Sequence, residues 1–85
     1  MSSLPIQKIG KDQNFDTITT NGIYRIDDEI TGENKPPIKG TSYGSILIVT
    51  SGNTCLCSQI YISVLNAKIY TRRETSVHWT EWSEN

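Results

Sequence analysis

Hydrophobic residues in this chain alternate with polar ones over short stretches, and nowhere recur at the three- and four-residue spacing of an amphipathic helix. The stretches are rich in Ile, Thr, Tyr and Val, which fit pleated, half-buried surfaces. Gly, Asn, Asp and Pro interrupt them at short intervals. The pattern predicts an all-β fold: a small antiparallel β-sheet or sandwich-like knob built from hairpins with long loops.

The first two strands follow directly from this pattern. Residues 23–26 form a strand after the turn dipeptide Asn21-Gly22, in which both residues tolerate positive φ. A loop then covers residues 27–42, because its two consecutive prolines exclude a central strand. Residues 45–50 are apolar on both faces, which places the second strand in the centre of a sheet or at a contact between chains.

A hairpin with strands at residues 57–64 and 68–73 is the clearest element. With Asn66-Ala67 as a two-residue loop, Val64 pairs with Ile69. Ala67 is unfavourable at positive φ, so a longer loop is the alternative. The pattern is that of a half-exposed antiparallel sheet, with one apolar face and one aromatic and polar face that we expect to be exposed. The apolar face carries Ile60, Ile62, Val64, Ile69 and Thr71, and the exposed face carries Tyr61, Ser63, Tyr70 and Arg72.

The two ends of the chain complete the expected organisation. Residues 79–82 contain Trp79 and Trp82, which point to opposite faces if this segment is a strand. One indole would then cover the core, and the other would stay at the surface or at an interface. Residues 1–14 are polar with scattered apolar positions. We expect them to form an N-terminal arm or linker before a β knob domain at residues 15–85.

Charge and hydropathy exclude two classes of partner. Eight Lys and Arg residues against nine Asp and Glu residues lack the basic excess of nucleic-acid-binding proteins. The longest apolar run, Ile46-Leu47-Ile48-Val49, is far shorter than the roughly 20 residues that span a bilayer. The start, Met1-Ser2-Ser3-Leu4-Pro5, lacks the basic and apolar blocks of a signal peptide. We therefore expect synthesis in the cytoplasm, without membrane insertion.

Residues that carry catalysis or bind metals are sparse. His78 is the single histidine, and neither a G-x-S-x-G motif nor a Gly-rich phosphate loop occurs. The acids at 27–29 are adjacent in a loop, where carboxylates are usually solvated. Cys55 and Cys57 are too few for a zinc site without carboxylates or another chain, so we interpret them as free thiols. We predict a protein that is not an enzyme and binds no cofactor or metal.

Aromatic side chains are the remaining chemical signal. Tyr and Trp anchor protein interfaces, and their ring faces stack on the apolar faces of sugars, although core packing is the default use of any aromatic residue. The candidate ligand or interface contacts are Tyr24, Tyr61, Tyr70, Arg72, Trp79 and Trp82.

Six segments, in order, carry a resemblance that covers about residues 14–83. The first is Phe15-Asp16-Thr17-Ile18-Thr19-Thr20-Asn21-Gly22-Ile23-Tyr24-Arg25-Ile26, and the second is Asn34 with Pro36-Pro37. The third and fourth are Gly44-Ser45-Ile46-Leu47-Ile48-Val49 and Gln59-Ile60-Tyr61-Ile62. The last two are Lys68-Ile69-Tyr70-Thr71-Arg72 and Trp79-Thr80-Glu81-Trp82. Together they resemble the "pyocin knob" domains of bacteriophage and pyocin tail fibres.

These segments are similar to the family's Ile-Thr-Thr-x-Gly-x-Tyr, Asn-x-Pro-Pro, Gly-x-Leu-x-Val, Thr-Gln-Ile-Tyr, Ile-Tyr-x-Arg and Trp-x-x-Trp motifs. In the fourth segment Ser58 stands where Thr is usual. The chain departs from the family in two places: residues 73–78 lack the Gly that usually precedes Trp79, and the Cys55-x-Cys57 pair is unfamiliar.

The resemblance implies a virion protein of the phage tail, made in the host cytoplasm. It implies a homo-oligomer, with a trimer favoured, that contacts other tail or baseplate proteins and attaches to a glycan receptor on the host surface. Two alternatives remain open. One is a purely structural virion connector, and the other is a carbohydrate-binding accessory module of a cell-wall-degrading protein.

Overall fold

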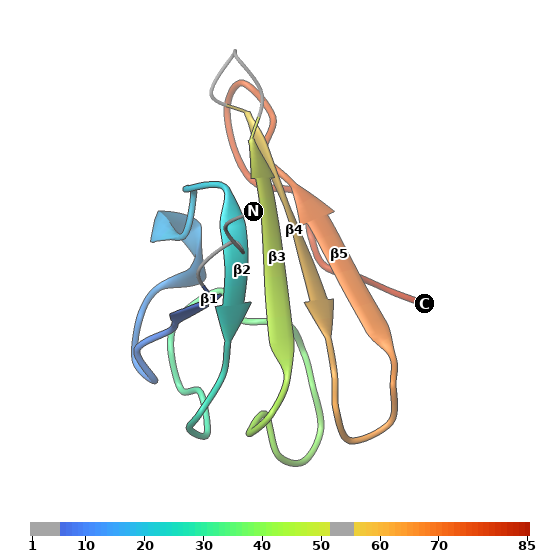
Figure 1. Cartoon of the computed structure of the whole chain (residues 1–85). Coiled ribbons are helices and arrows are strands. Elements are labelled where there is room, and N and C mark those ends of the chain that lie inside the picture. Colours follow the sequence, from blue (N-terminus) through green and yellow to red (C-terminus); the bar gives the residue numbers. More distant parts are fainter. Residues whose placement is uncertain (1–5, 52–55) are drawn as a thin grey trace, which may run out of the picture.

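Six strands form one sheet and follow each other across it in sequence order (Figure 1). The computed structural model describes residues 6–51 and 56–85, and η1 (Phe15–Thr17) is the only helical turn in these residues. All neighbouring strands are antiparallel except the first pair, which is parallel. The all-β prediction is confirmed, as a single mixed sheet. Its strands are β1 (Ile6–Lys8), β2 (Gly22–Arg25), β3 (Ile46–Ser51), β4 (Cys57–Ile62), β5 (Ile69–Arg73) and β6 (Ser83–Glu84).

The parallel pair brings part of the expected N-terminal arm into the folded unit. Ile6 of β1 pairs with Ile23 of β2, and the amide of Ile9 donates to the carbonyl of Arg25. Ile9 is only 1% exposed and belongs to the core. Residues 6–9 therefore form part of the knob, and residues 1–5 of the expected arm lie outside the described residues.

The strand that is apolar on both faces, β3, lies between β2 and β4, as predicted for a central strand. Leu47 and Val49 point to one face and are 0% and 2% exposed. We call this the inner face of the sheet, and the opposite face, to which Ile46 and Ile48 point, the outer face. The inner face holds the core, because the long loops pack against it.

The two faces of the β4–β5 hairpin are the reverse of the sequence prediction. Tyr61, Tyr70 and Arg72 are 0%, 3% and 7% exposed and lie on the inner face. Ile69, expected in the core, is 38% exposed on the outer face. Large aromatic side chains bury more apolar area than isoleucine and span the space between the sheet and its loops, which accounts for the reversal.

The register of this hairpin also differs from the predicted one. Tyr61 pairs with Tyr70 and Ile62 with Ile69, so the connection is longer than Asn66-Ala67 alone. Ala67 adopts a positive φ of 57°, and its amide donates to the carbonyl of Ser63. The longer loop, which the sequence left as the alternative, is therefore correct.

The loop between β2 and β3 is held together by internal hydrogen bonds and also packs against the segment that precedes η1. Buried Ser42 accepts a hydrogen bond from the amide of Ile30 and donates to the carbonyl of Asp28. At Gly32 a Cβ atom would lie 1.9 Å from the carbonyl oxygen of Gln13, so only glycine permits this approach of two backbones. The loop between β2 and β3 is thereby joined to the segment that precedes η1.

We predict that Leu47→Ala lowers the free energy of unfolding by about 2–5 kcal/mol, because the residue is fully buried on the central strand and its loss leaves a cavity. Urea unfolding followed by circular dichroism measures the change. The control is Val77→Ala, since Val77 is 81% exposed and its truncation should cost less than about 0.5 kcal/mol. Equal losses in the two variants would contradict the placement of the core.

Candidate functional site

A buried arginine lies on the inner face. Strand β5 directs Arg72 inward, and its side chain is 4% exposed. Its Nε donates a hydrogen bond of 2.8 Å to Gln59 Oε1. Its Nη1 lies 2.9 Å from Asp16 Oδ1, in a charge–charge contact that lacks hydrogen-bond geometry. A buried charge is tolerated only where such partners compensate its lost hydration.

Gln59 joins the arginine to the helical turn. It is fully buried on β4, and its Nε2 donates to the carbonyls of Phe15 and Ile18 at 2.7 and 2.9 Å. The carbonyl of Phe15 also accepts from the amide of Ile18 at the end of η1, so the Gln59 amide shares this acceptor and additionally binds the carbonyl of Ile18. One side chain therefore fixes the position of η1 over β4 and β5.

Asn14 and Asn34 hold Asp16 in place. Asn14 caps η1, because its side-chain oxygen accepts from the amide of Asp16 at 2.9 Å. Asn34 donates from Nδ2 to Asn14 Oδ1 at 3.0 Å and to Asp16 Oδ2 at 3.2 Å. The loop between β2 and β3 thus helps to direct the carboxylate of Asp16 at Arg72.

Both tryptophans lie against the same guanidinium group. The guanidinium carbon of Arg72 is 4.2 Å from the ring centroid of Trp79 and 4.8 Å from that of Trp82, within the range of cation–π contacts. Trp82 also packs edge-on against Phe15 and donates from its indole nitrogen to the carbonyl of Asn34 at 3.0 Å. The cation is thereby covered by apolar ring faces.

This convergence corrects the prediction that the two tryptophans point to opposite faces. Residues 79–82 are not a regular strand, because Trp79 forms only an isolated bridge with Glu74 and β6 begins at Ser83. The segment instead bends so that both indoles reach Arg72. The strand alternation that the prediction assumed does not apply to it.

An open cleft of about 590 Å³ lies beside the two indoles. Both rings are half-buried, so part of each remains accessible from the cleft. Polar and charged groups of the lining include Asp16, Lys35 and Glu81. The cleft therefore combines accessible aromatic rings with hydrogen-bonding groups of both charges.

Burial changes the proton affinity of two side chains on the inner face, Arg72 and Cys57. Desolvation lowers the pKa of Arg72, while the carboxylate of Asp16 acts in the opposite direction. Desolvation, together with the neighbouring carboxylate of Glu74, raises the pKa of the Cys57 thiol to about 11. Cys57 is a free, buried cysteine, as predicted, and Cys55 lies outside the described residues.

Three of the six candidate contacts predicted from the sequence belong to the core. Tyr24, Tyr61 and Tyr70 are at most 7% exposed, and Tyr24 donates from its hydroxyl to the carbonyl of Thr20. Side chains so deeply buried cannot form a contact surface, which corrects that prediction.

The other three candidates, Arg72, Trp79 and Trp82, come together at the cleft. Sequence analysis missed Asp16, Asn34 and Gln59, although each lies within one of the segments that carry the family resemblance. The inward direction of Gln59 could have been inferred only if the aromatic face of the hairpin had been taken as the buried one.

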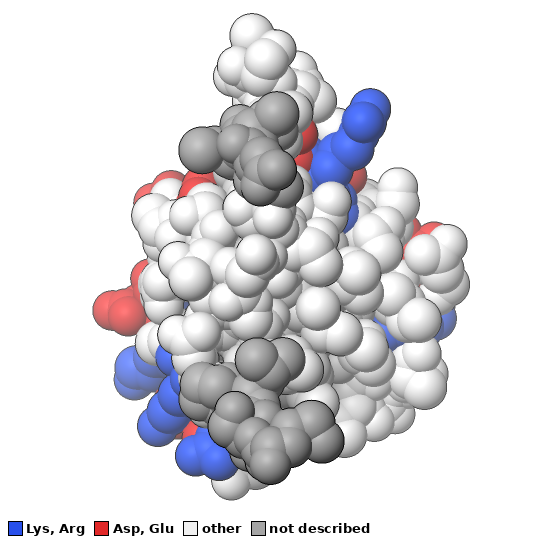
Figure 2. Space-filling view, turned by 45° about the horizontal axis from the view of Figure 1, so that its top comes forward, with Lys and Arg blue, Asp and Glu red and all other residues white. Residues whose placement is uncertain are grey.

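Metal and membrane signals are absent from residues 6–51 and 56–85. These residues contain no group of three His, Cys, Asp or Glu side chains that could hold a metal ion, and no helix in them is long and apolar enough to cross a membrane. His78 is exposed beside the cleft, with Nδ1 2.9 Å from the carbonyl oxygen of Trp79. In the face that Figure 2 shows, uncharged residues fill the middle, and charged side chains lie towards the edges.

Comparisons with family models, curated proteins and solved structures found no match for this chain. A functional assignment therefore rests on the geometry of the cleft and on the sequence motifs.

We predict that Arg72→Lys lowers the free energy of unfolding by about 2 kcal/mol, because an ammonium group cannot stack between the indoles and also donate to Gln59. The matched control is Arg73→Lys at the adjacent, exposed position, with an expected change below about 0.5 kcal/mol. Urea unfolding monitored by tryptophan fluorescence compares the two variants. A loss no larger for Arg72→Lys than for Arg73→Lys would contradict the role assigned to this cluster.

Because the thiolate is the reactive form, a Cys57 pKa of about 11 against an ordinary 9.0 leaves about a hundredfold less thiolate at pH 8. We predict slow alkylation of Cys57 by iodoacetamide in the folded protein and fast alkylation in urea. Peptide mapping by mass spectrometry reads the rate at this residue alone. Equal rates in the two conditions would show that the thiol is not protected.

Proposed function

We propose that this chain is a non-enzymatic module of a phage tail fibre or baseplate that attaches to a glycan on the host surface. The observation that carries the proposal is the pair of half-buried indoles beside an open cleft. Sugar rings present apolar C–H faces that stack on aromatic rings, while their hydroxyl groups require polar partners nearby. The cleft offers both.

Rigidity of the two indoles favours binding. Trp79 and Trp82 are held by the cation of Arg72, and Trp82 is additionally fixed by its hydrogen bond to Asn34. A ring that is already ordered loses little conformational entropy when a ligand stacks on it. The cluster thus supports a preformed site for a saccharide.

Convergence of the motif segments supports the tail-fibre context. Five of the six segments that resemble pyocin-knob domains each contribute to the cluster around Arg72, and the remaining segment supplies the central strand β3. Motifs that lie far apart in the sequence therefore share one structural role, which is to surround Arg72. The contributing residues are Asp16, Asn34, Gln59, Arg72, Trp79 and Trp82.

The contacts of the two acidic side chains in the cleft favour a binding role over a catalytic one. Two carboxylates line the cleft, those of Asp16 and Glu81. Asp16 contacts Arg72 and Asn34, whereas Glu81 has no ion pair or side-chain hydrogen bond among the described residues. Glycoside hydrolysis ordinarily uses a pair of carboxyl groups in distinct roles. A single available carboxylate fits hydrogen bonding to a sugar hydroxyl.

We predict that Trp79→Ala weakens binding to bacterial surface polysaccharides about five- to tenfold, since one stacked ring contributes about 1 kcal/mol. Trp79→Phe should retain most of the affinity, because it keeps an aromatic face. Binding is measured on an array of immobilised bacterial polysaccharides and by attachment of the labelled protein to host cells. Circular dichroism checks that each variant is folded.

Tyr43→Ala is the control for this experiment, because Tyr43 is an aromatic residue that is 61% exposed and does not line the cleft. Its removal should leave binding unchanged. A folded wild-type protein that binds neither the array nor host cells would contradict the attachment role and favour a structural connector.

A further inference from the structure

The outer face of the sheet carries isoleucine on five adjacent strands. Ile6, Ile46 and Ile69 are 57%, 38% and 38% exposed, and the others are partly exposed. None of the outer-face isoleucines belongs to the core cluster on the inner face. The outer-face residues are Ile6, Ile23, Ile46, Ile48, Ile60, Ile62 and Ile69.

Strand register arranges these side chains in two continuous rows. One row runs from Ile6 through Ile23 and Ile48 to Ile60, each paired with the next across the sheet. In the second row, Ile46 pairs with Ile62 and Ile62 pairs with Ile69. Directly opposed residues lie about 5 Å apart, so the rows make one contiguous apolar surface.

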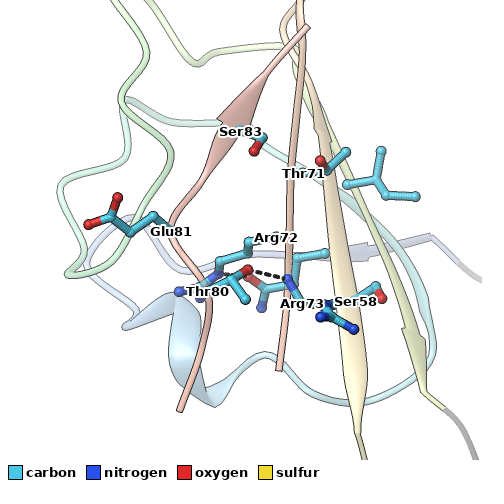
Figure 3. A pocket seen from close by; sticks show the side chains of 9 residues that line it. Ser58, Thr71, Arg72, Arg73, Thr80, Glu81 and Ser83 are labelled. Carbon is cyan, nitrogen blue, oxygen red and sulfur yellow. Dashed lines mark hydrogen bonds between the residues drawn. The ribbon is translucent and has the colours of Figure 1, made fainter. Parts of the chain in front are cut away.

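Charged residues lie beside the isoleucines and not between them. Lys8 and Arg25 continue the second row onto β1 and β2, next to Ile46, and Arg73 pairs with Ser58 beyond the first row. Beside Arg73, a hollow of about 520 Å³ is lined by Thr71, Thr80 and Ser83 (Figure 3). An apolar centre with a polar rim is the usual anatomy of a protein interface.

The isoleucine-rich composition of the outer face favours a permanent contact between identical chains. Interfaces with temporary partners concentrate their binding energy in Trp, Tyr, Arg and Met, whereas permanent homo-oligomer interfaces resemble a domain core cut in half. β-branched residues on a pleated surface are of the second kind. Among the charged residues beside the isoleucines, Arg25 is paired with Asp27, which limits charge repulsion between copies.

The area of the sheet and the short edge strands are compatible with face-to-face packing. At about 4.8 Å between strands and 3.3 Å per residue, the sheet spans roughly 25 by 18 Å, so two such faces cover about 900 Å², close to the roughly 1,000 Å² at which specific interfaces begin. The edge strands β1 and β6 have three and two residues, which offers little for pairing by strand addition. Association through side chains of the outer face is therefore the favourable mode.

We infer that copies of this chain associate through the outer face, with each copy covering the isoleucine rows of another. Sheets that pack face to face in this way lie about 10 Å apart and interdigitate their side chains. The inference stands independently of the glycan site, which lies on the inner side of the sheet.

Light scattering coupled to size exclusion tests this inference on the full chain at about 100 µM. The wild type should have a mass of two or three times 9.6 kDa. In the double variant Ile48→Thr/Ile60→Thr, the mass should fall to that of one chain, because two hydroxyl groups then lie in the centre of the first row. Threonine keeps the β-branched shape, so the strands should be retained in circular dichroism.

Val77→Thr is the matched control, because this valine is 81% exposed outside the sheet, and its variant should keep the wild-type mass. If Ile48→Thr/Ile60→Thr fails to fold, Ile46→Thr/Ile69→Thr tests the second row in the same way. A monomeric wild type overturns the inference, as does a folded double variant that keeps its mass.

Flotation with phosphatidylglycerol–phosphatidylcholine vesicles adds a further test, since a monomer that floats would assign the face to a lipid surface. Trp79→Ala should retain the oligomer, which separates this outcome from failure of the glycan site.

Discussion

Burial of the Arg72 guanidinium is the constraint on which the rest of this small fold depends. A cation removed from water is costly unless charge, hydrogen bonds and ring faces compensate it, and here these come from η1, β4 and the segment before β6. Asp16 and Gln59 can serve Arg72 only if η1 lies over the inner face. The two tryptophans can cover it only if the chain bends back after Trp79. One side chain thereby holds together loops that have little regular structure of their own.

The same constraint separates the two faces of the sheet into different roles. On the inner face, loops, tyrosines and the arginine cluster form the core and leave two indoles partly accessible beside a cleft. The outer face is left with isoleucine rows that no part of the core cluster covers. The proposed glycan site and the inferred association surface are thus consequences of one division of the sheet.

Sequence reasoning succeeded where local chemistry determines structure. The apolar run in β3 predicted a central strand, and Asn21-Gly22 marked the start of β2. It failed where the outcome depends on distant partners. The alternation around Tyr61 separates two faces without telling which is buried, because isoleucine and tyrosine both suit a core. Burial of Arg72 depends on Asp16 and Gln59, whose proximity only the folded chain creates. Strand β1 has three residues and pairs in parallel, too short a pattern to distinguish from a linker.

Coupling between Asp16 and Arg72 tests the central claim most directly. A double-mutant cycle with Asp16→Asn and Arg72→Gln, followed by urea unfolding, isolates the free energy of their interaction from the separate effects of each substitution. If the buried arginine organises the loops, the coupling free energy should lie between about 1 and 3 kcal/mol in favour of the pair. Additive effects of the two substitutions, with a coupling near zero, would contradict the claim that this contact holds η1 on the sheet.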